Sequence, residues 1–284
     1  MTTVRAFLAE VTRPLPGCPA GQSPCCPTQE VWALGCHVLR RPLARLLAAS
    51  AAERLDPEDE ARWRALIARR ALGEPLAYLV GHAEFWSLAL TVTPDVLVPR
   101  PETEILVERA LDTPAVEGAR YLDVGTGSGA VALALKKERP RALVAACDHS
   151  PAALAVARAN ATALGLDVAF WNGSWSDAIA ACSCDLVVSN PPYIESADPC
   201  LNGDGLRYEP RDALDGGDDG LRAIAALIPA AVRVLRPGGR LLIEHGARQD
   251  RPVRSLFEHT GLTDIVTHPD YAGHARVTGG VWRG

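Results

Sequence analysis

A glycine-rich segment, Asp123-Val-Gly-Thr-Gly-Ser-Gly129, follows a short apolar run and precedes a helical pattern. Glycine lets the backbone adopt positive φ and approach a ligand closely. Asp148 stands about 20 residues further on, where a carboxylate can accept hydrogen bonds from ribose hydroxyls. The spacing departs from the dinucleotide fingerprint G-x-G-x-x-G, and no Gly-Lys-Ser/Thr follows. The pattern therefore favours a nucleoside site over an NAD site, a nucleoside triphosphate site or an ordinary tight turn.

A second segment, Asn190-Pro191-Pro192-Tyr193, comes directly after the apolar run 186–189. Proline fixes φ and lacks an N–H donor, and Pro191 favours an extended backbone at Asn190. The Asn190 side-chain carbonyl and the Pro191 backbone carbonyl are then two acceptors at a fixed separation, which suits a planar NH2 group. Tyr193 adds an aromatic face that can stabilise a cation. A structural Pro-Pro turn is the alternative when the segment is taken alone.

The elements that must position these two segments alternate along the chain after residue 119. This pattern predicts an α/β fold with a mostly parallel sheet and helices on both faces. Ligands in such sheets bind beyond the carboxyl ends of the strands, where both segments would lie. Strands are expected at 121–124, 143–147, 168–171, 186–189, 240–243, 264–267 and 276–282, and helices at 130–139, 151–165, 219–235 and 251–260.

The first 80 residues are predicted to be helical, apart from a Pro- and Cys-rich loop at 13–27. The clearest helix begins at Asp56, which can cap it, with Pro57 in its first turn. Alternating apolar residues from 78 to 98, with Pro94–Asp95 as a turn, predict a β-hairpin. We therefore expect three parts: a helical substrate-recognition domain at 1–77, a hairpin linker at 78–99 and a catalytic domain at 100–284.

Composition and charge narrow the class of protein. The 284 residues carry a net charge of −5, with +2 over residues 1–80 and −7 over the remainder, which disfavours binding through nucleic-acid phosphates. No export signal is found, and the longest apolar run, Ala223–Val232, is too short to span a membrane. None of the eight cysteines forms a C-x-x-C pair, so free thiols and no metal are expected. We expect a cytoplasmic protein.

The glycine segment with Asp148 resembles motif I and the ribose acid of class I S-adenosylmethionine methyltransferases. Asn190-Pro-Pro-Tyr193 is similar to the motif of enzymes that methylate amide or exocyclic amino nitrogens. From about residue 64 to the end, the chain resembles the peptide chain release factor glutamine methyltransferase (HemK/PrmC) family. The other segments that carry this resemblance are Tyr78-Leu-Val-Gly81, Glu84-Phe-Trp86, Leu97-Val-Pro-Arg100-Pro-Glu102-Thr-Glu104, Tyr208-Glu209-Pro210, Ala213-Leu214, Asp219-Gly220, Glu244-His245-Gly246 and Arg276-Val277.

The resemblance implies a Rossmann-like methyltransferase sheet of seven strands whose last strand is antiparallel, with a small all-α N-terminal domain joined by the hairpin. The methyl donor, S-adenosyl-L-methionine, would be bound by Gly125, Thr126, Gly127, Ser128, Gly129, Asp148, Trp175 and Asn190. Ser174 stands where the family often has an acid before that tryptophan. The resemblance also implies catalytic roles for Asn190, Pro191 and Tyr193, and substrate contacts by Asn190, Pro191, Pro192 and Tyr193.

The implied substrate is the glutamine side chain of the Gly-Gly-Gln loop in class 1 peptide chain release factors. We expect a monomer with no direct nucleic-acid or membrane partner. Positioning an amide nitrogen requires no general base before attack, so His245 is expected to be structural, and Arg100 and Glu102 either contact ligands or form a domain-joining salt bridge. The alternatives are a glutamine methyltransferase of a ribosomal protein, an adenine-N6-type nucleic-acid methyltransferase and a non-catalytic binder of the donor.

Overall fold

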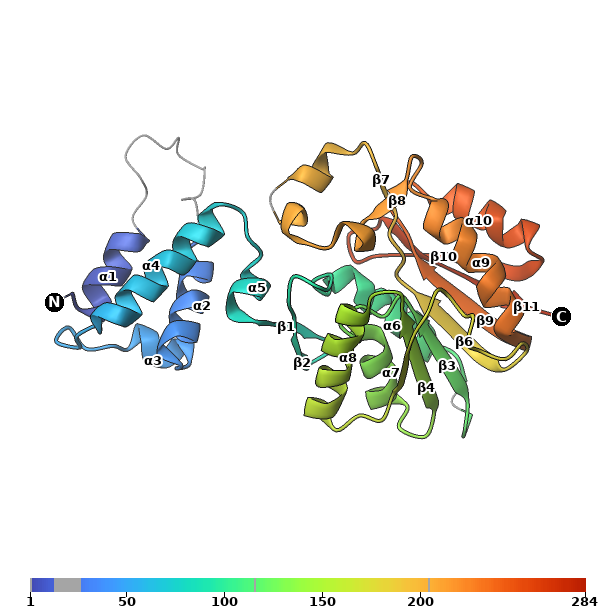
Figure 1. Cartoon of the computed structure of the whole chain (residues 1–284), viewed down its shortest axis with the longest axis horizontal. Coiled ribbons are helices and arrows are strands. Elements are labelled where there is room, and N and C mark those ends of the chain that lie inside the picture. Colours follow the sequence, from blue (N-terminus) through green and yellow to red (C-terminus); the bar gives the residue numbers. More distant parts are fainter. Residues whose placement is uncertain (1, 13–26, 115, 204) are drawn as a thin grey trace. The chain divides into compact units, whose positions relative to one another are not determined.

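The computed structural model describes residues 2–12, 27–114, 116–203 and 205–284. The predicted loop at 13–27 lies almost wholly outside the described residues. The chain divides into two compact units, Met1–Gly81 and His82–Gly284, and each is described by itself (Figure 1). The finer boundaries at 77 and 99 stay a prediction.

The first unit is a helical cluster built around one tryptophan. Trp63 is fully buried, donates from Nε1 to the Val31 carbonyl at 3.0 Å and stacks at a tilt on Phe7. Gly35 is required beside it, because a Cβ there would lie 2.1 Å from the indole ring. Asp56 caps its helix through the Glu58 N–H, as predicted. The helices are α1 (Val4–Val11), α2 (Thr28–Leu39), α3 (Leu43–Leu47), α4 (Pro57–Ala71) and α5 (Leu76–Val80).

The second unit opens with the expected hairpin, of strands β1 (His82–Phe85) and β2 (Leu88–Thr91). Pro94–Asp95 does form a turn, in which the Val96 N–H donates to the Thr93 carbonyl at 3.1 Å, but it follows the hairpin, whose own turn is Trp86–Ser87. Both turn residues have left-handed φ, 51° and 53°, which neither residue type favours. Contacts distant in sequence hold this conformation: Glu104 accepts from the Trp86 N–H, and Lys137 donates to both turn carbonyls.

Seven strands of the second unit form one sheet within the described residues, in the order β10-β11-β9-β6-β3-β4-β5. The central strands are parallel, whereas β11 runs antiparallel to both neighbours, which confirms the predicted fold. These strands are β3 (Arg120–Val124), β4 (Leu143–Asp148), β5 (Ala169–Asn172), β6 (Cys184–Ser189), β9 (Leu235–Glu244), β10 (Leu262–Pro269) and β11 (Ala275–Trp282).

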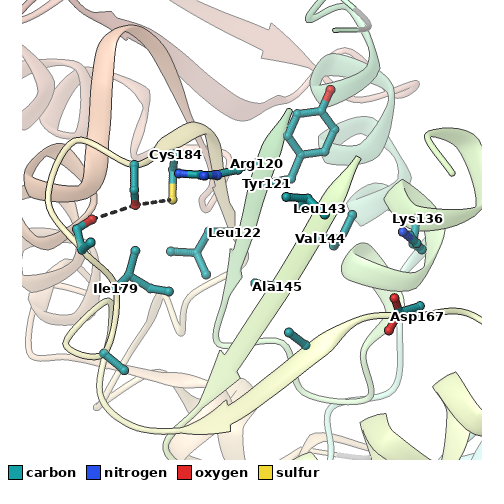
Figure 2. Close-up of a pocket in the computed structure, with 14 residues that line it drawn as sticks. Arg120, Tyr121, Leu122, Lys136, Leu143, Val144, Ala145, Asp167, Ile179 and Cys184 are labelled. Atoms are coloured by element: carbon teal, nitrogen blue, oxygen red, sulfur yellow. Dashed lines mark hydrogen bonds between the residues drawn. The ribbon is translucent and has the colours of Figure 1, made fainter. Parts of the chain in front are cut away.

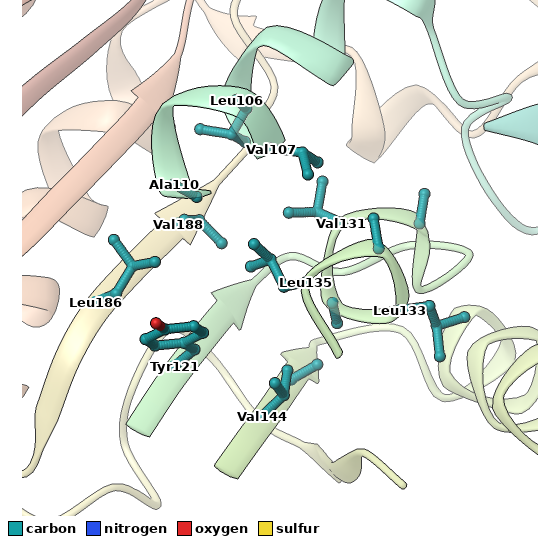
Figure 3. Close-up of a cluster of buried hydrophobic side chains, with 14 of the residues drawn as sticks. Leu106, Val107, Ala110, Tyr121, Val131, Leu133, Leu135, Val144, Leu186 and Val188 are labelled. Atoms are coloured by element: carbon teal, nitrogen blue, oxygen red, sulfur yellow. The ribbon is translucent and has the colours of Figure 1, made fainter. Parts of the chain in front are cut away.

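Helices cover both faces of this sheet. On one face, α6 (Glu104–Leu111), α7 (Ala130–Glu138) and α8 (Pro151–Leu164) pack over Tyr121, Val144, Leu186 and Val188 (Figure 3). On the other face, α9 (Arg222–Val234) and α10 (Asp250–His259) pack over Leu122, Val124 and Val187. Alternate residues of each strand thus serve opposite faces, as the pleat requires. The remaining elements are η1 (Pro101–Thr103), β7 (Ile194–Glu195), η2 (Pro199–Asn202), η3 (Leu206–Tyr208), η4 (Arg211–Ala213) and β8 (Asp215–Gly217).

The sheet order reverses between its two central strands. From β3 the chain moves outward to β4 and β5, then returns to the other side of β3 as β6. Val124 and Ser189, the last residues of β3 and β6, are register partners, and the Ser189 hydroxyl donates to the Val124 carbonyl at 2.6 Å. The glycine segment and Asn190 follow these residues directly. Both segments therefore begin at the topological switch point, where α/β sheets bind ligands.

Candidate functional site

A buried carboxyl, that of Asp123, holds the glycine loop after β3 through hydrogen bonds. Asp123 Oδ2 accepts from the Thr126 hydroxyl at 2.6 Å and from the Ala132 N–H at 3.1 Å. Burial raises the pKa of Asp123 to about 6, although both hydrogen bonds act to lower it. Gly125 and Gly127 have φ of 72° and 55°, which a residue with a Cβ rarely adopts. The loop is thereby closed tightly over the end of β3.

Asp148 ends β4 beside that loop. Its Oδ2 accepts from the Gly127 N–H and its Oδ1 from the Ser150 N–H, each at 2.9 Å. The side chain is 8% exposed and borders a cavity. Each carboxylate oxygen can accept more than one hydrogen bond, so the group remains able to bind two neighbouring hydroxyls. The geometry suits the ribose role expected of this residue.

A cavity of about 480 Å³ opens over the carboxyl ends of β3, β4 and β6. This volume lies in the range of small-molecule and cofactor sites. Among the described residues that line the cavity are four aspartates and two arginines: Asp95, Asp148, Asp212, Asp215, Arg211 and Arg222. The cavity therefore favours a ligand with net positive charge. Apolar walls come from Val96, Leu97, Val124, Ala153, Trp175, Ala223 and Ala226.

The Asn190 segment forms another wall of the same cavity, together with Pro191 and Pro192. Asn190 Nδ2 donates to Thr103 Oγ1 at 3.1 Å. Within the described residues, Asn190 Oδ1 accepts no hydrogen bond. One end of this amide is thus engaged by the protein, and its acceptor end is available to a ligand.

Tyr193 lies differently from the rest of its segment. Its hydroxyl donates to Glu244 Oε1 at 3.2 Å, and its ring packs against the apolar cluster beneath α9 and α10. Burial is the main cause of a strongly raised pKa for this phenol. Tyr193 is not among the described residues that line the cavity. A direct catalytic role for its ring stays a prediction.

The structure thus brings together seven of the residues singled out from the sequence. Gly125, Gly127, Asp148, Trp175, Asn190, Pro191 and Pro192 all line the cavity. In the described part of the chain, Thr126, Ser128 and Gly129 do not line it. The Thr126 hydroxyl donates to Asp123, the Ser128 carbonyl accepts from Asn160, and Gly129 is the N-cap residue of α7. These three residues shape the loop rather than its ligand-facing surface.

Arg100 and His245 serve the structure of this unit. Arg100 pairs with the buried Glu209, whose other oxygen accepts from the Val98 N–H at 2.9 Å. This ion pair lies within the second unit, so of the two alternatives given for Arg100, a salt bridge that joins two domains is excluded for this pair. His245 is buried between the Gly246 carbonyl and the Thr278 hydroxyl, and burial lowers its pKa. These contacts fit the structural role expected of it.

Two residues behind Asn190 were not assigned a role from the sequence. Thr103 and Glu244 are 4% and 1% exposed, respectively. Thr103 lies in η1, far from Asn190 in the sequence, and no local pattern indicates their contact. An isolated acid at the end of the apolar strand β9 was the available signal for Glu244.

A second cavity, of about 300 Å³, lies at the opposite ends of the strands. Arg120, Leu143 and Cys184, the first residues of β3, β4 and β6, line it. Figure 2 shows its wall of Leu122, Ala145 and Ile179. It contains none of the site residues expected from the sequence. In the described ranges, neither a cluster of three metal-ligating side chains nor a helix able to span a membrane is found.

Comparisons with known proteins agree with this geometry. The family model for the methyltransferase small domain matches residues 101–201, and that for the PrmC N-terminal domain matches residues 26–81. A methyltransferase from Pyrococcus furiosus, known from a crystal structure, has a TM-score of 0.53 at 19% identity. The match covers 76% of this chain and 97% of that chain. At that identity it supports the fold alone.

Curated relatives named release factor glutamine methyltransferase are much closer. The relative from Vibrio cholerae is 44% identical over 259 residues, or 90% of each chain. The relative from Bordetella pertussis is 46% identical over 256 residues, or 89% of this chain and 94% of that one. With a methyltransferase fold and this identity over nearly its whole length, the chain is an enzyme that belongs to the release factor glutamine methyltransferase family.

Proposed function

We propose that the protein transfers a methyl group from S-adenosyl-L-methionine to the side-chain amide nitrogen of the glutamine in the Gly-Gly-Gln loop of class 1 release factors. One observation carries the proposal. Asn190 stands on the wall of the cavity that Asp148 and the glycine loop also line, with its Nδ2 engaged by Thr103 and its Oδ1 available to accept. The names of the curated relatives supply the identity of the substrate.

The residues present fit this donor. S-adenosylmethionine carries a sulfonium, an ammonium and a carboxylate, a net charge of +1 that complements the acidic cavity lining. Asp148 would accept hydrogen bonds from the ribose hydroxyls of the donor, and Trp175 would border its adenine. The backbone at Gly125 and Gly127 would lie close to the donor. When bound, the donor supplies an electrophilic methyl group.

The protein's own contribution is to hold the acceptor. An amide nitrogen is a weak nucleophile because its lone pair is delocalised into the carbonyl. Asn190 Oδ1 and the Pro191 carbonyl would accept its two N–H bonds and direct the lone pair toward the methyl group. The carbon–nitrogen bond forms as the bond between the methyl carbon and the sulfonium sulfur breaks, and one N–H proton is then lost to solvent, so no base is needed before attack. Catalysis then comes mainly from positioning and from acceptors that stabilise the developing positive charge.

The rest of the chain has a place in the same proposal. The helical unit matches the family model for the PrmC N-terminal domain, and residues 1–80 have a net charge of +2, whereas the rest of the chain is acidic. This unit is therefore the candidate surface for recognising the release factor. We propose that the enzyme acts as a monomer in the cytoplasm.

The test is a methyl-transfer assay with labelled donor. Parallel reactions contain a class 1 release factor, its loop variant with glutamine replaced by alanine, total ribosomal proteins, and DNA. We expect label on the wild-type factor alone. Undiminished label on the alanine variant, or label only on ribosomal proteins or DNA, would contradict the proposal.

A further inference from the structure

A buried polar cluster lies directly behind Asn190 and outside the proposed chemistry. It consists of Thr103 in η1, Glu244 at the end of β9 and Tyr193 in the segment after β6. Three separate elements thus contribute one polar group each to a region from which water is largely excluded. Buried polar groups in such places hold one another in fixed directions.

The donors and acceptors in this cluster can be ordered. Thr103 Oγ1 accepts from Asn190 Nδ2, so its single proton must point elsewhere. The Thr103 hydroxyl is near enough to Glu244 to lower the pKa of its carboxyl, as a hydrogen-bond donor does, although the two groups are not at full hydrogen-bonding geometry. The Tyr193 hydroxyl donates to Glu244 Oε1. An ionised carboxylate only accepts hydrogen bonds, so the Tyr193 proton points to Glu244, and the same carboxylate is the acceptor toward which the Thr103 proton can turn.

This order extends to Asn190. Because the Thr103 proton is directed to Glu244, Thr103 can offer Asn190 only lone pairs. The Asn190 amide must then turn its NH2 group inward and its Oδ1 outward. The reverse orientation would place two acceptor oxygens face to face.

Several charged groups surround Glu244. Burial raises its pKa to about 7, Arg276 lowers it and Glu102 raises it. Arg276 is itself held by Asp270 at 3.1 Å, and burial lowers the pKa of the neighbouring His245. Within the described residues, Glu244 Oε2 has no partner at hydrogen-bonding geometry. A glutamine would satisfy a merely structural position at lower cost, since burying a carboxylate is expensive.

We propose that Glu244, acting through Thr103, is a positioning residue that fixes the Asn190 side chain with Oδ1 toward the substrate amide. The inference rests on the proposed function and names what orients its key acceptor. Glu244 and Thr103 touch no substrate in this scheme. Their effect passes entirely through the orientation of Asn190.

Two substitutions break the chain of hydrogen bonds without removing much volume. Thr103→Val deletes the hydroxyl, and Glu244→Gln adds an NH2 donor that can reverse the Thr103 hydroxyl. Thr103→Ser keeps the hydroxyl and is the conservative rescue. Thr162→Val, on the exposed side of α8, is the matched control for the loss of a threonine hydroxyl.

The first readout is kinetic. We expect Thr103→Val and Glu244→Gln to lower kcat for release-factor methylation by about 10- to 100-fold, since a small misplacement of a reacting group costs this much. Donor affinity and melting temperature should stay near the wild-type values, and Thr103→Ser should recover most of the loss. A kcat within about twofold of wild type in both variants would overturn the inference, as would a parallel collapse of donor affinity.

The second readout does not depend on activity. The chain has four asparagines, at 160, 172, 190 and 202, so asparagine-selective 15N labelling gives a small set of side-chain NH2 resonances. The Asn190 pair is assigned by its absence in Asn190→Ala. We expect it to shift in Thr103→Val and to titrate with pH in the wild type but not in Glu244→Gln. If the wild type fails to label the factor, the proposed function fails, and these resonances still decide the orientation. An Asn190 pair unmoved by either substitution overturns the inference.

Discussion

The site has two halves. The glycine loop with Asp148, where the methyl donor is proposed to bind, is the donor half, and Asn190 with Pro191, where the substrate amide is proposed to bind, is the acceptor half. Each half lies against a buried carboxyl, and the two carboxyls are held by different kinds of contact. Asp123 lies under the glycine loop, and its hydrogen bonds come from Thr126 and Ala132 in the same contiguous segment. Glu244 lies behind Asn190, where the Tyr193 hydroxyl donates to it and the Thr103 hydroxyl lowers its pKa, and both residues come from distant parts of the chain. The donor half is therefore a local structure, whereas the acceptor half exists only once η1, β6 and β9 have come together.

The largest effect is expected from Asn190→Ala, which removes the acceptor itself. We expect kcat to fall by about 100- to 1,000-fold, the usual cost of losing one preorganised hydrogen-bonding group, with donor affinity changed by less than about threefold. Single-turnover methylation and calorimetric donor binding measure the two quantities. Asn202→Ala, at an exposed asparagine, is the control and should behave as wild type. Donor affinity that falls in parallel with kcat would place Asn190 in the donor half instead.

Asp148→Ala should give the opposite pattern. Loss of a charged acceptor for ribose hydroxyls is expected to weaken donor binding by about 10- to 100-fold. At saturating donor, kcat should change much less. Asp212→Ala removes an acid from the same cavity lining, but that side chain is 87% exposed, so screening by water should keep its effect small. Equal losses in the two variants would mean that the overall charge of the cavity, and not the Asp148 contact, binds the donor.

This contrast explains what the sequence could and could not predict. Gly125, Gly127 and Asp148 were identified because one strand, one turn and the next strand end fix their arrangement locally. Asn190 was identified because its flanking prolines carry their own backbone restriction. Thr103 was not assigned a role, since its contact with Asn190 depends on how η1 packs against the sheet.

The hairpin turn shows the same limit from the other side. Pro94–Asp95 has typical turn residues and does form a turn, whereas the hairpin closes at Trp86–Ser87, which has left-handed φ without glycine or asparagine and is stabilised by Glu104 and Lys137. Local preference was overridden there by contacts far away in sequence. The succession of strands and helices along the chain and a mostly parallel sheet were nevertheless predictable, because apolar runs alternate with amphipathic helices over the whole catalytic unit.

Asp123→Ala tests whether the local carboxyl serves only the donor half. Both the Thr126 hydroxyl and the Ala132 N–H donate to the same oxygen, Asp123 Oδ2, and alanine removes that acceptor. We expect the glycine loop to loosen and donor affinity to fall about tenfold, in line with the cost of one unsatisfied buried hydrogen bond. At saturating donor, kcat should stay within about threefold of wild type. A fall in kcat as large as that of Glu244→Gln would contradict a division of labour between the two carboxyls.

The smallest expected effect is a dependence of kcat on pH, which should distinguish Glu244 from Asp123 because their pKa values differ. The pKa of Glu244 is raised from 4.5 to about 7, so at pH 7 about half of the molecules carry it ionised, as the pure acceptor that Thr103 requires. The protonated carboxyl can donate to Thr103 and release the Asn190 orientation, so kcat should rise with pH, by about twofold from pH 7 to about pH 8.5. The pKa of Asp123 is about 6, so any change in donor affinity from this group should occur about one pH unit lower. Single-turnover rates at saturating donor, with Glu244→Gln as the control that lacks the titrating group, measure the rise. A wild-type kcat profile that Glu244→Gln reproduces would assign the pH dependence to another group and remove Glu244 from the acceptor half.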